Sequence, residues 1–194
     1  MKLSQEQSEA NRKAILGAAE RLFRERGLGG VGVAELMEAA GFTHGGFYNH
    51  FASKQDLAAE ACGDALHRAN ASLAGQLQNG RGDPWRRYLE QYLSPAHRDD
   101  PAEGCTLSAL AADAGREGAG VQRSFAQGLA EAVEVLAAHL GRGGALTKAA
   151  ARAQALQTWS EAIGALVLAR AVARADPTLS AEVLAANRRK LLPR

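Results

Sequence analysis

The sequence is short of cysteine, of aromatic residues and of long apolar runs, and the first and last shortages exclude whole classes of protein. Two cysteines in 194 residues, Cys62 and Cys105, do not make the disulfide framework of a small secreted domain. No apolar run approaches the length of about 20 residues that spans a bilayer, and the polar N-terminus lacks the apolar core of a signal peptide. These absences predict a cytoplasmic protein that does not contact membranes.

Charge of one sign is not in excess either. The formal net charge of the chain is +2, and residues 1–60 contain seven Lys and Arg against eight Asp and Glu, which leaves −1. This balance excludes a polycation that binds nucleic acid without regard to sequence. If DNA is the partner, the groups that hold it must be placed locally.

Ala, Leu, Arg and Glu are abundant, and they favour helix over strand. Apolar residues recur at steps of three and four, which predicts about nine helices and no strand. The length allows one small module and one larger helical core. The helices are expected over residues 11–26, 33–40, 43–51, 54–79, 85–93, 105–114, 121–140, 148–174 and 179–189.

The segment from Gly30 to Leu57 encodes two short helices joined at a glycine. Gly41 permits the positive backbone angle of a tight turn, and Phe42 can fill the corner between the helices from inside. Such a turn exposes the N-terminal end of the second helix, which a major groove about 12 Å wide accepts. The pattern predicts a helix-turn-helix. The alternative is plain core packing with solvated His and Lys side chains.

The same run strongly resembles the TetR family signature in Gly27, Val33, Leu36, Ala40 to Thr43, Phe47, Tyr48, His50, Phe51, Ser53, Lys54 and Leu57. With the first helix, the resemblance covers residues 10–57. It implies an all-α chain with a three-helix DNA-binding domain over 1–53 and a ligand-binding and dimerisation domain over 54–194. It further implies a transcriptional repressor, a homodimer that holds palindromic double-stranded operator DNA until a small molecule binds.

The resemblance also implies roles for residues of the second short helix. Thr43 and His44 would open this recognition helix, and Phe47 and Phe51 would face inward. The sequence departs from the family pattern at Gly32, where many relatives have a Thr or Ser that touches a phosphate. Tyr48 could instead be half buried beside Phe47. The implied DNA-binding residues are Thr43, His44, Gly45, Gly46, Tyr48, Asn49, His50 and Lys54.

Large aromatic residues of the second half supply candidates for the ligand site, because they combine an apolar face with a polar tip. As a group they favour an apolar or aromatic ligand, although each could equally be an ordinary core residue. The predicted ligand-binding residues are Trp85, Tyr88, Tyr92, Cys105, Phe125 and Trp159.

Cys105 suggests a chemical trigger, because it follows Gly104 at the start of a helix, where the positive end of the helix dipole favours a thiolate. His97 and Arg98 lie close by in sequence. The segment from His97 to Asp113 looks similar to a TetR subgroup that includes the N-ethylmaleimide-responsive repressor, where a cysteine reacts with electrophiles. The alternative is a small, inert, buried cysteine. Cys62, on an apolar helix stripe, is expected to be inert.

The last two helices carry long apolar stripes that a small domain alone would not satisfy, which predicts a four-helix interface between two copies. Each residue of these stripes could also face its own core. The predicted contacts are Leu156, Trp159, Ile163, Leu166, Val167 and Leu184.

An enzyme finds no support, since there is no phosphate-binding loop, no nucleophile elbow and no metal-ligand spacing among the five histidines. No catalytic site, metal or cofactor is expected. The remaining rival is a helical ligand-binding or interaction protein of TetR fold that has lost specific DNA binding. The near-neutral N-terminal part and Gly32 are consistent with that rival.

Overall fold

The computed structural model describes residues 5–192, and in this range all regular secondary structure is helical, which confirms the all-α prediction. Within the same range no helix is both long and apolar enough to cross a bilayer. Nine α-helices and one 3-10 helix follow one another: α1 (Gln5–Arg26), α2 (Val33–Ala39), η1 (His44–Asn49), α3 (Lys54–Asn79), α4 (Pro84–Tyr92), α5 (Pro95–Asp99), α6 (Thr106–Ala114), α7 (Ala119–Leu140), α8 (Lys148–Val172) and α9 (Pro177–Leu191).

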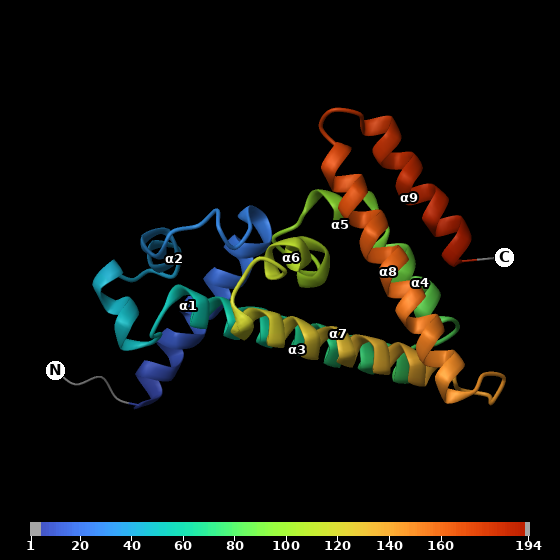
Figure 1. Cartoon of the computed structure of the whole chain (residues 1–194), viewed down its shortest axis with the longest axis horizontal. Helices are drawn as coiled ribbons and strands as arrows, with labels where there is room; N and C mark the ends of the chain where they lie inside the picture. Colours follow the sequence, from blue (N-terminus) through green and yellow to red (C-terminus); the bar gives the residue numbers. More distant parts are fainter. Residues whose placement is uncertain (1–4, 193–194) are drawn as a thin grey trace.

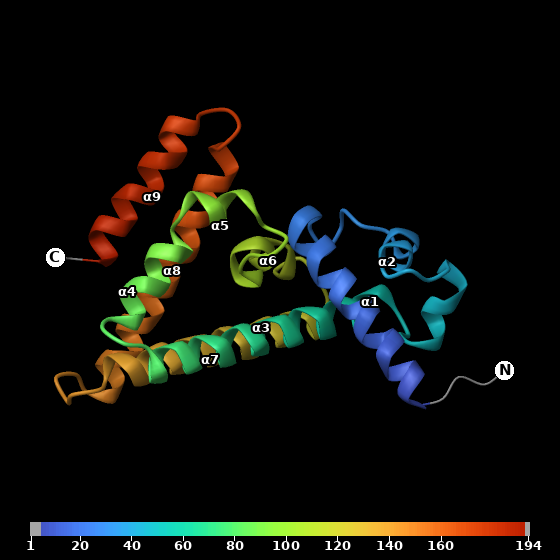
Figure 2. The same cartoon turned by 180° about the vertical axis from the view of Figure 1, so that it is seen from behind.

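The molecule is elongated, with its N-terminal helices at one end (Figure 1). We call residues 5–53 the head and residues 54–192 the body. The long helix α3 leads from the head along the length of the body, and α7 runs beside it in both views (Figures 1 and 2). Helices α4, α8 and α9 stand together at the far end, and α6 lies between them and the head.

Capping side chains explain where most helices of the body begin. At each start a side-chain oxygen accepts a hydrogen bond from the backbone N–H three residues on, which stabilises a helix by about 1 kcal/mol. A proline follows the cap of three of these helices and fits their first turn. The caps are Ser53, Asp83, Ser94, Thr147 and Asp176.

The core consists of two apolar clusters. The first joins the head to α3, α6 and α7, and it includes Phe23, Phe47 and Leu110. The second fills the far end of the body around Trp85 and Trp159. The first cluster extends across residue 53, so the head packs directly on the body, and the division of the chain at 53/54 stays a prediction.

Helices α3 and α7 approach closely at Gly128. A Cβ atom there would lie 2.7 Å from the Cβ and 2.6 Å from the Cδ1 of buried Leu66. We expect Gly128→Ala to lower the free energy of unfolding by about 1–2 kcal/mol, because the overlap outweighs the better helix propensity of alanine. Gly75→Ala on α3 is the control, because an added Cβ atom there would meet no neighbouring residue within 4 Å outside the backbone of its own helix. This change should be neutral or stabilising. Urea denaturation measures both, and an unchanged Gly128→Ala protein would contradict this packing.

The structure corrects half of the predicted dimer contacts. Trp159, Leu166 and Leu184 are buried in the second cluster of their own chain. Trp159 packs there against Trp85, Tyr88 and Tyr92 of α4, and α8 packs against both α7 and α9. Ile163 is half buried. Leu156 and Val167 remain 42% and 41% exposed, and Leu168, which the sequence analysis omitted, is 59% exposed.

Candidate DNA-binding face and ligand cavity

The predicted corner of the helix-turn-helix lies at Gly41. Its φ of 82° is the positive value that the turn requires, and the N–H groups of Gly41 and Phe42 donate to the carbonyls of Glu38 and Met37 at 2.9 and 2.8 Å. Phe42 is half buried against the first cluster. At the other end of α2 the N–H of Gly32 donates to the Glu35 carboxylate at 2.9 Å, so α2 begins without a capping side chain on residue 32.

The recognition segment is a 3-10 helix rather than the predicted α-helix. Thr43 stands at its N-cap position, but its side chain makes no capping hydrogen bond. Two successive glycines, Gly45 and Gly46, weaken an α-helix here by about 1 kcal/mol each relative to alanine. Gly46 also faces the methyl group of Met37, 3.5 Å from where a Cβ atom would lie.

Two aromatic residues of this segment face inward and one faces outward. Phe47 and Phe51 are buried, as the family resemblance implied. Tyr48 is 68% exposed, and its ring meets the edge of Phe47 at a centroid distance of 5.2 Å. The phenol of Tyr48 therefore projects from a fixed base into solvent.

The other predicted DNA-binding residues differ in exposure. Thr43, His44, Gly45 and Asn49 are exposed, whereas Gly46, His50 and Lys54 are half buried. Lys54 is the first residue of α3, where the N-terminal end of the helix attracts anions. We call the predicted DNA-binding residues together the reading face: Thr43 to Gly46, Tyr48 to His50 and Lys54.

Sequence reasoning missed the residue that fixes the reading face to the body. The guanidinium of Arg12 donates to the carbonyl of His50 and to Glu60, and it lies over the ring of Phe51 at 4.2 Å. Arg12 thereby joins α1, the end of η1 and α3. In the sequence it is one of several basic residues on the polar side of a helix, so nothing marks its role.

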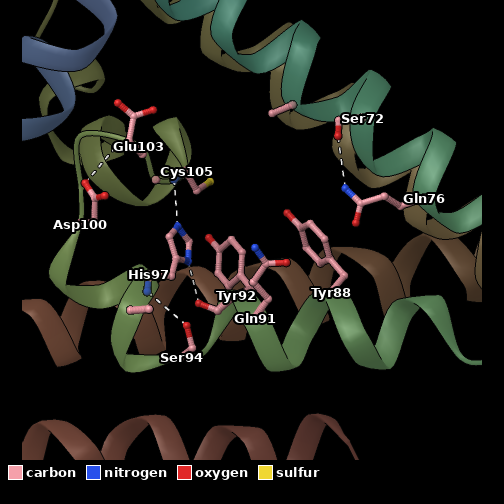
Figure 3. Close-up of a pocket in the computed structure, with 13 residues that line it drawn as sticks. Ser72, Gln76, Tyr88, Gln91, Tyr92, Ser94, His97, Asp100, Glu103 and Cys105 are labelled. Atoms are coloured by element: carbon pink, nitrogen blue, oxygen red, sulfur yellow. Dashed lines mark hydrogen bonds between the residues drawn. The ribbon is translucent and has the colours of Figure 1, made fainter. Parts of the chain in front are cut away.

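A cavity of about 410 Å³ lies between α3, α4, α5 and the loop that precedes α6 (Figure 3). Of the predicted ligand-binding residues, Tyr88, Tyr92 and Cys105 line it. Trp85 and Trp159 pack behind the tyrosines, with centroid distances of 5.5 Å from Trp85 to Tyr88 and 5.9 Å from Trp159 to Tyr92. Phe125 belongs to the first cluster and does not line the cavity, which corrects that prediction: this part of α7 faces α3 and α6.

The cavity also contains polar residues that were not predicted to bind ligand. Gln76 and Ser72 reach it from α3, Gln91 from α4, and His97 and Asp100 from α5 and its end (Figure 3). Only tertiary packing brings these elements together, and no local sequence signal marks the glutamines. His97 was noted merely as a sequence neighbour of Cys105.

His97 is held as a neutral imidazole. Its Nδ1 lies 2.7 Å from the carbonyl oxygen of Tyr92. Because a carbonyl oxygen can only accept, Nδ1 carries the proton. The other ring nitrogen, Nε2, accepts a hydrogen bond from the Cys105 N–H at 3.0 Å. Burial lowers the pKa of His97, and the charge of Arg170 lowers it further. The hydrogen bond to the Tyr92 carbonyl acts in the opposite direction and raises it. The neutral ring therefore links the Tyr92 carbonyl to the N–H of Cys105, the N-cap residue of α6. We call this pair of hydrogen bonds the clamp.

The clamp predicts a loss of stability in acid. A His whose pKa is lower in the folded chain stabilises the fold fully above about pH 6.5, and this contribution disappears as the pH falls through the folded value. We therefore expect the free energy of unfolding of the wild type to fall more steeply below pH 6.5 than that of His97→Gln. His139, whose pKa burial also lowers, contributes to both proteins and cancels. His67→Gln, at an exposed position, is the control. Parallel curves for wild type and His97→Gln would contradict the clamp.

The two cysteines lie in different surroundings. Cys62 is buried, and burial raises the pKa of its thiol to about 12. Cys105 is half buried and lies on the wall of the cavity. Only Cys105 is therefore placed to meet a small molecule that enters the cavity.

Comparisons with known proteins agree with this geometry. Residues 15–61, which contain the corner at Gly41 and the reading face, match the family of bacterial regulatory proteins known as tetR. This part of the chain has the sequence pattern of the TetR family of regulators. The matched family consists of regulatory proteins, which favours a regulator over an enzyme.

Among curated relatives, the chain is 38% identical over 71 residues to the transcriptional regulator TtgR of Pseudomonas putida, covering 37% of this chain and 33% of TtgR. It is 29% identical over 105 residues to the transcriptional repressor NemR of Escherichia coli, covering 53% of each. The matches thus span between a third and about half of these relatives.

Solved structures share the whole TetR fold. The reduced form of E. coli NemR has a TM-score of 0.80 at 23% identity and covers 94% of this chain and 95% of that one. A TetR family regulator from Agrobacterium tumefaciens has a TM-score of 0.77, also at 23% identity, and covers 95% and 96%. At this identity the likeness concerns the fold alone.

Proposed function

We propose that the chain is a sequence-specific transcriptional repressor that binds palindromic operator DNA as a homodimer and leaves it when a small molecule enters the cavity. The observation that carries the DNA-binding role is the exposed Tyr48, whose ring packs on buried Phe47, which in turn packs on buried Phe51. A rigid base limits the entropy lost when the side chain contacts DNA. Residues 1–53 would carry this role, and residues 54–194 would carry ligand binding and dimerisation.

The dimer would form through α8 and α9. Leu156 and Val167 lie eleven residues, or about three turns, apart on one face of α8, and Leu168 adjoins them. Such a row of exposed apolar side chains is typical of a helical interface. A two-fold axis there would present two reading faces to one duplex.

The loop that lines the cavity also holds the head, which suggests how a ligand releases DNA. Arg24 of α1 donates to the carbonyl of Ala102 at 2.7 Å, and Arg21 pairs with Glu103 at 2.9 Å. At the other end of α6, Asp113 accepts from the N–H of Leu28 at 2.9 Å. A ligand that moves this loop and α6 would shift α1, and with it the angle of the reading face on α3.

Cys105 adds a chemical route to the same release, and its reactivity is directly testable. We expect N-ethylmaleimide to modify Cys105 in the native chain at least about tenfold faster than Cys62, since the thiolate is the reactive form and burial suppresses it at Cys62. Mass spectrometry of the labelled protein gives the site. Cys105→Ser should take up label at least about tenfold more slowly than the wild type until it is unfolded, whereas Cys62→Ser should behave like the wild type.

The same variants test whether reaction at Cys105 releases DNA. Electrophiles should dissociate the wild-type and Cys62→Ser complexes and leave the Cys105→Ser complex intact. Unchanged release from Cys105→Ser would end the role proposed for this thiol, while leaving non-covalent induction open to a separate test.

The DNA-binding proposal is tested by selecting sites from a random pool of duplexes and measuring affinity at fixed salt. We expect a palindromic consensus bound at least about a thousandfold more tightly than unrelated DNA. Weak binding without sequence preference would instead support a TetR-fold ligand-binding protein that no longer reads DNA.

A further inference from the structure

The wall of the cavity contains a buried phenol that lacks an ordinary hydrogen-bond partner. Tyr92 is buried, and within the described residues its hydroxyl makes no hydrogen bond of normal distance and angle. The Cys105 thiol and the Ser108 hydroxyl lie beside it. Ser108 donates its one proton to the Cys105 carbonyl and accepts from Arg170, so it does not also donate to Tyr92. A buried hydroxyl without a well-placed acceptor is unfavourable, so a ligand that brought an acceptor atom to this part of the wall would gain a hydrogen bond.

The hydroxyl of Tyr92 is a donor and not an anion. Burial raises the pKa of Tyr92 well above its usual range, and the neighbouring Cys105 raises it further. Burial raises the pKa of Tyr88 in the same way. Both phenols therefore keep their protons at neutral pH, and an acceptor atom is the complement of Tyr92.

The aromatic wall has a fixed, flat shape. The rings of Tyr88 and Tyr92 stand one turn apart on α4, 5.9 Å between centroids and 29° from parallel, and their hydroxyls point the same way, toward α3 and the loop before α6 (Figure 3). Trp159 meets both rings edge-on from behind, at 6.1 and 5.9 Å. A wall of this kind suits a planar ligand.

The cavity offers nothing to neutralise an anion. Among residues 5–192, those that line it include no Lys or Arg, while Asp100 and Glu103 add two carboxylates. His97 has committed both ring nitrogens within the chain. Arg170, beside Gly104, is bonded to the carbonyls of His97 and Arg98 and to Ser108. A negatively charged ligand would meet repulsion without a partner.

We propose that the cavity takes an uncharged planar organic molecule whose carbonyl oxygen accepts a hydrogen bond from the Tyr92 hydroxyl. The inference rests on the proposed function insofar as the cavity is the inducer site, and it adds the chemical class of the inducer. Ligands of the same shape without the oxygen would bind more weakly, and ligands with a carboxylate more weakly still.

Three matched probes test the proposal by isothermal titration calorimetry on the full chain: fluorenone, fluorene without the carbonyl, and fluorenone carboxylate. We expect fluorenone to bind roughly tenfold more tightly than fluorene, and the carboxylate at least about tenfold more weakly than fluorenone. In Tyr92→Phe the two uncharged probes should bind equally, with the affinity for fluorene retained. Tyr88→Phe, on the same wall, should keep the preference for fluorenone.

A second measurement separates ligand recognition from a structural role. Tyr92→Phe removes no ordinary hydrogen bond, so its melting temperature should equal or exceed that of the wild type. A marked fall in melting temperature would show that the hydroxyl is bonded within the fold and would overturn the proposal. It would also be overturned if no probe bound, if the wild type failed to prefer fluorenone, if the carboxylate bound best, or if Tyr92→Phe kept the preference.

Release of DNA by each probe is measured separately from binding of the probe. Equal binding of fluorene and fluorenone, with release of DNA by both, would sink the carbonyl inference and leave the proposed function intact. Selective binding of fluorenone without any release of DNA would support the inference and count against the inducer role.

Discussion

A chain carrying Val167→Glu and Leu168→Glu is expected to be monomeric and to lose at least about a hundredfold in operator affinity. Both side chains are exposed on α8, at 41% and 59%, so the isolated chain should still fold. In a dimer they would be buried, and placing carboxylates there would cost several kcal/mol for each copy. The affinity falls because two reading faces that are no longer linked must bind their half-sites independently.

Sedimentation equilibrium and operator titration at one salt concentration measure the two effects. Leu129→Glu is the matched control, since Leu129 is a partly exposed apolar residue on α7, outside α8 and α9. It should remain dimeric and bind DNA like the wild type. A dimer that survives the double substitution would contradict the proposed interface.

Tyr48→Ala is expected to lower operator affinity by roughly ten- to a hundredfold without lowering the melting temperature. The side chain is 68% exposed and meets only the edge of Phe47, so the fold loses little when it is removed. The DNA complex, by contrast, loses a rigid phenol that reaches a phosphate or a base edge.

Two companion variants distinguish the loss of a DNA contact from the loss of structural support. Tyr48→Phe keeps the ring and should lose less affinity than Tyr48→Ala, which isolates the contribution of the hydroxyl. Arg12→Met should also weaken DNA binding, but with a lower melting temperature, because Arg12 holds the carbonyl of His50 and the ring of Phe51. Wild-type affinity in Tyr48→Ala would mean that this surface does not read DNA.

The head could be predicted from the sequence because its signals are local. Gly41 must supply a positive φ for the corner, and the neighbouring aromatic residues alternate between core and surface in a fixed order. The exact helix type could not be predicted, since Gly45 and Gly46 tip a short segment from α to 3-10 geometry. Helix α5 was missed although Ser94 and Pro95 are a cap and a first-turn proline, because the surrounding Asp and Pro residues suggested a break.

The body was harder to predict because one helix can carry two apolar faces. On α8, Trp159 and Leu166 face the second cluster while Leu156 and Val167 face outward, and periodicity does not say which face meets the chain itself. The cavity depends on how α3, α4 and the loop before α6 are placed in space. Tyr88, Tyr92 and Cys105 meet there, whereas Phe125, with the same chemical character as the other candidates, lies in another cluster.

The most direct test of the account is the spacing between the two halves of the bound DNA. Two reading faces on one symmetric dimer require half-sites centred about 34 Å apart, one helical turn or a multiple of it. Inserting five base pairs between the halves of a selected operator turns one half to the opposite side of the duplex. We predict that this lowers affinity at least about a hundredfold and that inserting ten restores part of it. Equal affinity for all three duplexes would contradict a paired, groove-reading dimer.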